Sequence, residues 1–355
     1  MSTFVDIFAG AGGLTQGLLS TGELEPIFAV EHDAAAAATY RENFGDHVFF
    51  GDIKTVRRFP KADVVVGGPP CQGFSLLGAR RRDDQRNELW REFARTIHTA
   101  KPQIFMMENV PELLHSDQYR RFKELASALG YVVDARVLNS ADFGAPQKRR
   151  RAIVIGRRGT APIWPIQTHW DPNKAEGRRR WRTVRDALQA VPLRPDCPDL
   201  AGLESNSSRK LHFGRSATPV SLERYRAVPP GGNRFDLAER RPEITPQCWL
   251  DKKTGSTDIF GRLWWDRPSV TIRTEFFKPE KGRYLHPSAH RPITHYEATL
   301  LQGFPKSFIW SGSKVEVARQ IGNAVPIRLG RALGLAINRM LAGDISSDTR
   351  AALAT

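Results

Sequence analysis

The stretch Phe4-Val5-Asp6-Ile7-Phe8-Ala9-Gly10-Ala11-Gly12-Gly13-Leu14 opens the chain with a short apolar run and a glycine-rich turn. Such a turn between a strand and a helix is typical of nucleotide-binding α/β folds, because glycine lets a cofactor approach the backbone amides. Glu31 follows the second apolar run, where a carboxylate can accept hydrogen bonds from both ribose hydroxyls. The pairing indicates a nucleoside cofactor, although the turn alone also fits a nicotinamide dinucleotide site or a plain tight turn.

Asp52 and Ile53 follow a third apolar segment. They are placed to bracket an adenine, through a hydrogen bond from the ring and an apolar face. The alternative is an aspartate at the edge of the core.

The first half of the chain alternates short apolar runs with amphipathic stretches, the pattern of a mostly parallel sheet covered by helices. Strands are predicted at residues 4–8, 27–30, 64–66, 104–107, 132–138 and 152–155. Apolar residues recur at helical spacing in two stretches between them: Leu89, Phe93 and Ile97, and then Phe122, Leu125 and Leu129. We predict an α/β fold whose mixed sheet carries helices on both faces.

The character of the sequence changes from about Gly159. Pro, Gly, Arg and Trp become frequent, periodicity fades, and segments such as residues 228–233 have the composition of turns. We predict a second, smaller lobe that is irregular and β-rich. Helical order returns near Pro292, and a closing helix is predicted after Pro326 from the spacing of Leu329, Leu333, Ile337 and Met340. This helix is expected to return to the first domain.

The 355-residue chain is strongly basic, with 53 Lys and Arg against 38 Asp and Glu, a formal charge of +15 and a pI of about 10.1. A polyanionic partner is therefore a candidate, although basicity alone does not establish one. Runs of three arginines begin at Arg80, Arg149 and Arg178. Each run is either a set of phosphate contacts or a solvated face.

The three cysteines, Cys71, Cys197 and Cys248, form no Cys-x-x-Cys pair and no cluster with histidines. This pattern argues against a zinc site, any other metal site or a disulfide framework. The N-terminus has no basic and apolar leader pattern, and no apolar run reaches the length of about 18 residues that a membrane span needs. We expect a soluble, cytoplasmic protein.

The strongest chemical signal is Gly67-Gly68-Pro69-Pro70-Cys71-Gln72-Gly73-Phe74-Ser75, directly after a predicted buried strand. Sites collect at the ends of strands in α/β sheets, and the glycines and prolines fix a rigid loop. A structural cysteine would more naturally sit inside the strand. Cys71 is therefore predicted to be a nucleophile.

The next predicted strand ends in Glu108-Asn109-Val110-Pro111, which brings a carboxylic acid to the same edge of the sheet as Cys71. Such an acid can donate a proton to a ring nitrogen. Further on, alternation along an extended segment would point Gln147, Arg149 and Arg151 to one face. The alternatives are an exposed glutamate at a strand end and a solvated basic run.

Taken in order, these motifs resemble the bacterial DNA cytosine-5 methyltransferase family. The Phe-x-Gly-x-Gly turn, the Pro-Cys-Gln loop, Glu-Asn-Val and Gln-x-Arg-x-Arg follow that family's sequence order. Residues 291–305 and 320–326 are similar to its last two motifs. The resemblance covers nearly all of the chain except roughly residues 160–285, which is where the family holds its variable target-recognition domain.

The resemblance implies a Rossmann-like methyltransferase fold that uses S-adenosylmethionine, with S-adenosylhomocysteine as product and no metal. Residues 1–160 would form the first part of the catalytic domain, 161–285 the target-recognition domain, and 286–355 a segment that completes the catalytic domain. The cofactor residues carried over are Phe8, Gly10, Gly12, Gly13, Leu14, Glu31, His32, Asp52, Ile53, Pro70, Asn323, Ala324 and Val325. The DNA contacts carried over or inferred nearby are Gln72, Ser75, Asn109, Gln147, Arg80 and Arg81.

The catalytic residues implied are Cys71, Glu108, Arg149 and Arg151. Cys71 would add to carbon 6 of a flipped-out cytosine, Glu108 would protonate or hydrogen-bond ring nitrogen 3, and Arg151 would hold the carbonyl. Two departures from the family pattern stand out, His32 in place of a bulky apolar residue and Pro111 after Glu-Asn-Val.

Three other readings compete with this one. A transfer-RNA cytosine-5 methyltransferase shares the motifs, but usually lacks a large recognition lobe and carries a Cys-Phe-Thr signature that this chain does not contain. A dehydrogenase would explain the glycine turn and leave the cysteine loop without a role. A catalytically silent DNA-binding protein conflicts with the intact catalytic set.

The resemblance also sets expectations about partners. The substrate is expected to be double-stranded DNA in the bacterial cytoplasm, the enzyme a monomer, and a cognate restriction endonuclease its separate companion.

Overall fold

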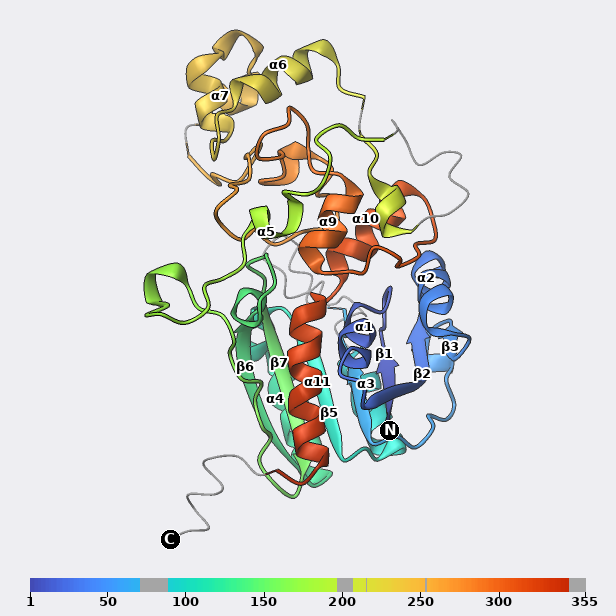
Figure 1. Ribbon diagram of the computed structural model, residues 1–355. Helices are drawn as coiled ribbons and strands as arrows, with labels where there is room; N and C mark the ends of the chain where they lie inside the picture. The colour runs from blue at the N-terminus through green and yellow to red at the C-terminus, as the bar shows by residue number, and fades with distance from the viewer. Residues whose placement is uncertain (71–88, 197–206, 215, 253, 345–355) are drawn as a thin grey trace. The chain divides into compact units, whose positions relative to one another are not determined.

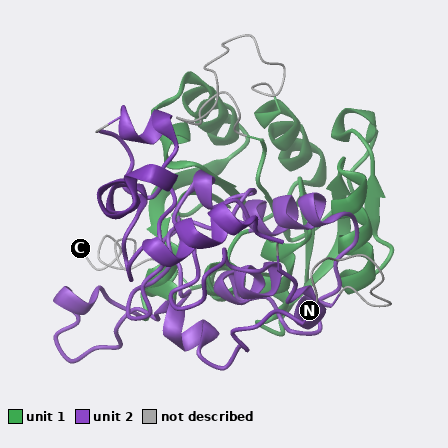
Figure 2. Cartoon of the chain, turned by 90° about the horizontal axis from the view of Figure 1, so that it is seen from above, with its two compact units in different colours: residues 1–143, 150–168, 325–355 green, residues 144–149, 169–324 purple. Residues whose placement is uncertain are grey.

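The computed structural model describes residues 1–70, 89–196, 207–214, 216–252 and 254–344. The chain divides into two compact units, shown in different colours in Figure 2. The first unit comprises Met1–Phe143, Arg150–Thr168 and Val325–Thr355, and the second comprises Gly144–Arg149 and His169–Ala324. The functional division predicted from the sequence, with boundaries at 160/161 and 285/286, stays a prediction.

The first unit is built on one seven-stranded sheet in the order β3-β2-β1-β4-β5-β7-β6 (Figure 1). The strands are β1 (Ser2–Ile7), β2 (Leu24–Glu31), β3 (Val48–Phe50), β4 (Val64–Gly67), β5 (Ile104–Asn109), β6 (Tyr131–Asn139) and β7 (Arg150–Arg158). β7 runs antiparallel to both of its neighbours, and the other pairs are parallel. The strand order reverses between β1 and β4, and ligands bind at the carboxyl ends of strands at such a switch point.

Helices cover both faces of this sheet, which confirms the predicted α/β fold. They are α1 (Gly13–Leu19), α2 (Ala34–Phe44), α3 (Trp90–Ala100), α4 (Asp117–Ala128) and α11 (Ile327–Leu341). On one face α3 and α4 pack against alternate strand residues such as Val65 and Phe105. On the other face α1 and α11 pack against Val64, Val66 and Ile104. β4 is apolar throughout, and β5 is apolar as far as Met107, because both faces of these central strands are buried.

The C-terminal helix α11 lies beside α1, so the end of the chain does return to its beginning (Figure 1). A Cβ atom on Gly17 would lie 2.6 Å from the Cα of Gly330, so the two backbones touch where glycines face each other. Leu329, Leu333 and Ile337, which carry the predicted periodicity, are all buried in the core.

All six strands predicted from the sequence are present, most of them a few residues longer than expected. β3 was missed because it is a three-residue edge strand whose Phe49 and Phe50 are exposed, so its pattern is not that of a half-buried strand. In α4 the periodicity placed Leu125 on the buried face, whereas its side chain is 40% exposed. Within the described ranges, no helix combines the length and apolarity needed to cross a membrane.

The second unit corrects one prediction, since its described part is not β-rich. Its α-helices are α5 (Val184–Leu188), α6 (Pro219–Ala227), α7 (Arg234–Arg240), α8 (Gln247–Leu250), α9 (His295–Gln302) and α10 (Lys314–Asn323). Among its described residues the only β pairing is isolated bridges. The frequent prolines cannot donate to a ladder, and the segments lack the alternation that would bury one face of a sheet.

Buried arginines supply the hydrogen bonds that a β-ladder would have provided. Arg262, 2% exposed, donates to the carbonyl oxygens of Val228, Tyr225, His286 and Ala289. Arg283 binds the carbonyls of Gly231, Gly232, Arg262 and Thr257 in the same way. Burial lowers the pKa of Arg262 to about 10, and the guanidinium stays charged at neutral pH. Irregular backbone can therefore be buried here without leaving these carbonyls unpaired.

Candidate cofactor and catalytic site

The glycine-rich turn and Glu31 are joined directly. The amide of Gly10 donates to Oε2 of Glu31 over 2.7 Å, and the amides of His32 and Asp33 donate to Oε1 over 2.9 and 2.8 Å. Glu31 ends β2 next to β1, so the sheet brings the two together at its carboxyl edge. A carboxylate has about four acceptor positions, which leaves capacity on Oε2 for a ligand hydroxyl.

The turn is open at one glycine and packed at another. Gly10 has φ +57°, and a Cβ placed there would meet no atom within 4 Å. Gly12 has φ +83°, and its Cβ would lie 2.2 Å from the ring of Phe44. The left-handed backbone and the free space above Gly10 fit a nucleoside cofactor that approaches the turn from that side. Gly13 is buried at the start of α1.

The remaining cofactor candidates of the first unit lie at the same edge in different environments. The His32 side chain is 73% exposed, and its Nδ1 lies 3.2 Å from Oε1 of Glu31, whose hydrogen bond raises the pKa of the imidazole. Asp52 is exposed and caps a 3-10 helix, with Oδ1 accepting from the amide of Lys54. Ile53 is 3% exposed and Leu14 6%, and both side chains belong to the core. Phe8 holds a left-handed φ of 59°, which is costly for a residue with a side chain.

The end of β5 carries the acidic candidate. Oε1 of Glu108 lies 2.8 Å from Nε of Arg151 on β7, and the two side chains are only 12% and 16% exposed. Arg151 also donates from one terminal nitrogen to the carbonyl of Arg150. Oε2 of Glu108 would lie 3.1 Å from a Cβ at Gly68, so the carboxylate borders the start of the cysteine loop. The predicted acid and the predicted carbonyl-binding arginine thus form an ion pair.

Asn109 links β5 to that loop. Its side-chain amide donates to the carbonyl of Pro69 over 2.9 Å, and its oxygen accepts from the amide of Val110 over 2.8 Å. Asn109 is 4% exposed, so its buried side chain ties the end of β5 to Pro69. Pro70, half-buried, is the last described residue before the loop. Cys71, Gln72, Ser75, Arg80 and Arg81 lie outside the described residues.

The other two residues of the Gln-x-Arg-x-Arg motif, Gln147 and Arg149, form hydrogen bonds within the second unit. Gln147 donates to Oε1 of Gln302 over 2.9 Å and accepts from the amide of Ile272 over 2.8 Å. Arg149 is 3% exposed and donates to the carbonyls of Ile272, Gly322 and Asn323. Sequence alternation placed these two side chains with Arg151, which instead pairs with Glu108 of the first unit.

The C-terminal cofactor candidates lie at the end of α10, where Arg149 binds the carbonyls of Gly322 and Asn323. Asn323 ends α10 and is exposed, whereas Ala324 and Val325 are 9% and 7% exposed. Position 322 has no room for a side chain, because a Cβ on Gly322 would lie 2.4 Å from the backbone of Arg273 and Thr274.

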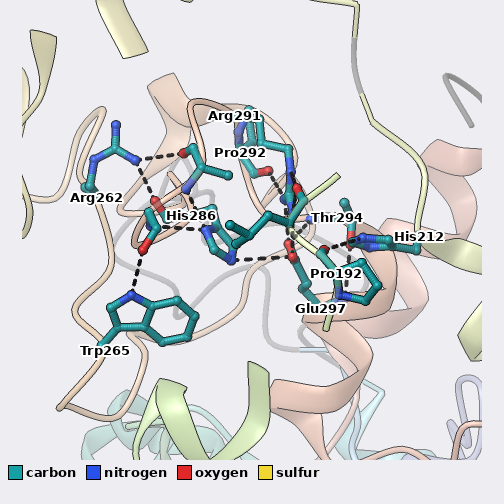
Figure 3. Close-up of polar contacts among 12 residues, drawn as sticks. Pro192, His212, Arg262, Trp265, His286, Arg291, Pro292, Thr294 and Glu297 are labelled. Carbon is teal, nitrogen blue, oxygen red and sulfur yellow. Dashed lines mark hydrogen bonds and ion pairs between the residues drawn. The ribbon is translucent and has the colours of Figure 1, made fainter. Parts of the chain in front are cut away.

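The polar network at the start of α9 contains Arg291, Thr294 and Glu297 of the predicted penultimate motif, together with two histidines that the sequence analysis missed (Figure 3). Arg291 pairs with both carboxylate oxygens of Glu297, over 2.8 and 2.7 Å, and Glu297 in turn caps the helix at Thr294. Nδ1 of His286 accepts from two backbone amides, which fixes the proton on Nε2, 3.6 Å from Glu297. Nδ1 of His212 lies 3.0 Å from the hydroxyl of Thr294. Burial lowers the pKa of His286 to about 4, so this network holds a neutral imidazole.

A buried aspartate behind the glycine turn was also missed. Asp6 in β1 is 1% exposed, and the hydroxyl of Thr15 donates to it over 2.6 Å. Tyr40 lies 3.2 Å from the same hydroxyl. Burial raises the pKa of Asp6 to about 7. The sequence signal was a lone acidic residue inside an apolar strand. No cluster of three or more metal-ligating side chains occurs in the described part of the chain.

The strand order with an antiparallel β7, together with the glycine turn and Glu31, defines the fold of the S-adenosylmethionine-dependent methyltransferases. A profile of the C-5 cytosine-specific DNA methylase family matches residues 2–339. The chain therefore belongs to the C-5 cytosine-specific DNA methylase family.

Individual relatives agree over nearly the whole chain. The Type II methyltransferase M1.HphI of Haemophilus parahaemolyticus is 34% identical over 353 residues, which cover 95% of this chain and 87% of that protein. The Type II methylase M.HgiDII of Herpetosiphon aurantiacus is 31% identical and covers 96% of both chains. A prophage-encoded DNA modification methyltransferase of E. coli has a similar fold, with a TM-score of 0.72 at 24% identity over 96% of this chain and 100% of that one.

Proposed function

We propose that this protein is a site-specific DNA (cytosine-5-)-methyltransferase of a restriction-modification system, with Cys71 as its covalent nucleophile. The observation that carries the proposal is that a candidate cofactor site and a candidate catalytic pair lie at the same edge of the sheet, in a chain of this family. The Gly10–Glu31 contact lies at the ends of β1 and β2, and the Glu108–Arg151 pair lies two strands along from β1. The first suits a nucleoside, and the second suits a polar heterocycle.

The cofactor in this proposal is S-adenosylmethionine, which when bound supplies a methyl group on a sulfonium. Glu31 would accept from the ribose, and the amides near Gly10 would face the open side of the turn. Asp52, Ile53 and His32 would bracket the adenine. The buried Leu14 would support the turn from the core. Pro70, Asn323, Ala324 and Val325 keep the assignment that the resemblance gives them.

On the cytosine, the thiolate of Cys71 forms a bond to carbon 6, which makes carbon 5 nucleophilic. Glu108 delivers a proton or hydrogen bond to ring nitrogen 3 and so draws electron density from carbon 6. Arg151 holds the ring carbonyl and, through its pair with Glu108, keeps the carboxyl oriented. After carbon 5 gains the methyl group and loses its proton to a base, the bond to Cys71 breaks and the aromatic ring is restored.

The substrate in this proposal is duplex DNA with the target base swung out of the stack, because carbon 6 is inaccessible within it. Gln72, Ser75, Arg80 and Arg81 would contact the DNA near the flipped base. Asn109, Gln147 and Arg149 act through other residues, given their buried contacts. Residues 161–285 would read the sequence, while 1–160 and 286–355 would carry catalysis. We expect a monomer in the bacterial cytoplasm beside a separate cognate endonuclease.

The test is bisulfite sequencing of mixed-sequence duplex DNA after incubation with S-adenosylmethionine, with Cys71→Ser and Cys248→Ser proteins alongside. Cys248 is an exposed thiol and serves as the matched control. Protected cytosines in one short sequence context, absent with Cys71→Ser and kept with Cys248→Ser, support the proposal. Protection that persists with Cys71→Ser overturns the covalent mechanism. If bisulfite converts every cytosine of the DNA that was incubated with the wild-type protein, the proposal that DNA is the substrate is overturned.

A further inference from the structure

Three exposed cations of the second unit lie over tryptophan rings. Nζ of Lys148 is 4.7 Å from the ring centre of Trp181. Cζ of Arg185 is 5.4 Å from the ring centre of Trp265, and Cζ of Arg267 is 4.9 Å from that of Trp264. A cation above an aromatic face keeps its charge and loses side-chain freedom, so each of these groups is partly ordered in advance.

The cations belong to three chain segments that are joined by backbone hydrogen bonds. The amide of Lys148 donates to the carbonyl of Ser269 over 2.8 Å. The amide of Val184 donates to the carbonyl of Arg267 over 2.9 Å, and that of Arg185 to Trp265 over 2.8 Å. The segments around residues 148, 185 and 267 are therefore neighbours, and we call Lys148, Arg185 and Arg267 with their tryptophans the cation platform.

Two of the three rings beneath the cations, those of Trp264 and Trp265, are fixed in place by further contacts. Nε1 of Trp265 donates to the hydroxyl of Ser288 over 2.7 Å, and its ring meets His286 edge-on at 5.4 Å (Figure 3). The polar network of Glu297 and His286 thus orients the ring that carries Arg185. Trp264 is held by Arg283, 4.1 Å from its ring centre, and fits against Gly231, where a Cβ would lie 2.3 Å from Nε1.

The charges of the platform are not neutralised by carboxylates among the described residues. Neither Lys148, Arg185 nor Arg267 has an ion pair with a described Asp or Glu, whereas Arg241 pairs with Glu243 and Lys278 with Glu275. The carboxylate next to Arg185, that of Asp186, accepts instead from the amide and hydroxyl of Thr183. Exposed, partly ordered cations that lack carboxylate partners and lie on hydrogen-bonded neighbouring segments match a polyanion.

We propose that the cation platform binds backbone phosphates of duplex DNA and positions the second unit on it without reading sequence. The proposal rests on the proposed function, which makes duplex DNA the substrate. Lys and Arg contacts to phosphates set register and orientation, and they release condensed counterions on binding. The platform therefore contributes a salt-dependent share of affinity that is the same for target and unrelated duplexes.

The experiment measures dissociation constants for a target duplex and a scrambled duplex between about 0.05 and 0.2 M salt. The variants are Lys148→Gln, Arg185→Gln, Arg267→Gln and the triple variant. Arg241→Gln, an exposed arginine outside the platform, is the control for lost charge. Lys148→Arg keeps the charge and tests whether charge alone is needed. Thermal unfolding midpoints show that each variant is folded.

Each lost phosphate contact should lower the salt slope by about 0.9, so the affinity lost across this salt range shrinks by about 3.5-fold per variant. For the triple variant, the affinity lost across the same salt range should shrink by about 40-fold on both duplexes. Arg241→Gln and Lys148→Arg should keep the wild-type slope. A folded triple variant with the wild-type slope overturns the platform, as does a loss confined to the target duplex. Salt-dependent binding without methylation by the wild-type protein overturns the proposed function and leaves the platform standing.

Discussion

Nε of Arg151 lies 2.8 Å from Oε1 of Glu108, which joins the ends of two antiparallel strands through a mostly buried ion pair. The pair links the residue proposed to act on ring nitrogen 3 to the one proposed to hold the carbonyl. Because each side chain orients the other, their contributions to turnover should not be independent.

Glu108→Gln should lower kcat by about 100-fold or more, because the amide cannot deliver a proton to the ring. Arg151→Gln should also lower kcat, and the double variant should lose much less than the product of the two single effects. The measurement is single-turnover methylation of one duplex. Arg136→Gln, which breaks an exposed pair with Asp134, is the control and should keep its rate. Multiplicative losses in the double variant would show that the two residues act separately.

Asn109→Asp should slow turnover without weakening cofactor binding. The aspartate keeps the acceptor for the amide of Val110, but it loses the donor to the carbonyl of Pro69 and sets an acceptor against that carbonyl. A buried hydrogen bond left unmade costs about 1–3 kcal/mol, so kcat should fall by about tenfold as the cysteine loop loses its anchor. Cofactor affinity, measured by calorimetry, should change by less than about twofold. An equal loss in kcat and cofactor affinity would mean that the whole sheet edge is disturbed.

The fold of the first unit can be predicted well from the sequence, because the patterns that determine its strands and helices lie within short stretches of the chain. Apolar runs that are buried on both sides of a sheet keep their signature, and so does the periodicity of α11. β3 lacks that signature because two of its three residues face solvent. In the second unit, arginines such as Arg262 bind carbonyls far along the chain, and no local pattern records such pairings.

The candidate site divides in the same way. Residue types and their position after strands indicated Gly10, Glu31 and Glu108, and the structure brings the first two into contact. Alternation placed Gln147 and Arg149 beside Arg151, but it carries no information about carbonyls more than 100 residues later. The contacts of Arg149 with Ile272 and Gly322 therefore became visible only in the folded chain.

Because of those contacts, Arg149 and its neighbour Arg150 should differ in their contribution to stability. Arg149→Met removes the donors for the carbonyls of Ile272, Gly322 and Asn323, so it should lower the free energy of unfolding by about 2–5 kcal/mol. Arg150 is exposed, and Arg150→Met should stay within about 0.5 kcal/mol of the wild-type protein. Urea unfolding followed by tryptophan fluorescence measures both. Equal midpoints for the two variants would show that the buried contacts of Arg149 contribute nothing to stability.

Asp6 gives the stability of the first unit a pH dependence whose sign is fixed by its raised pKa. Burial raises this pKa from 3.8 to about 7, so the folded protein holds a proton that the unfolded chain releases. The stabilising contribution of the protonated acid is complete below about pH 4 and is lost as the pH rises to about 7, a change on the order of 4 kcal/mol. His286, whose pKa is lowered, acts in the opposite direction.

Asp6→Asn keeps an acceptor for the hydroxyl of Thr15 but cannot ionise. Any fixed cost of the amide is the same at every pH, so the comparison across pH isolates the titration of Asp6. The variant should gain thermal stability relative to the wild-type protein as the pH rises from 4 to 8, with most of the gain below about pH 7. Asp46→Asn, at an exposed carboxylate, should show no such trend. A constant difference between Asp6→Asn and wild type from pH 4 to 8 would mean that Asp6 does not titrate in this range.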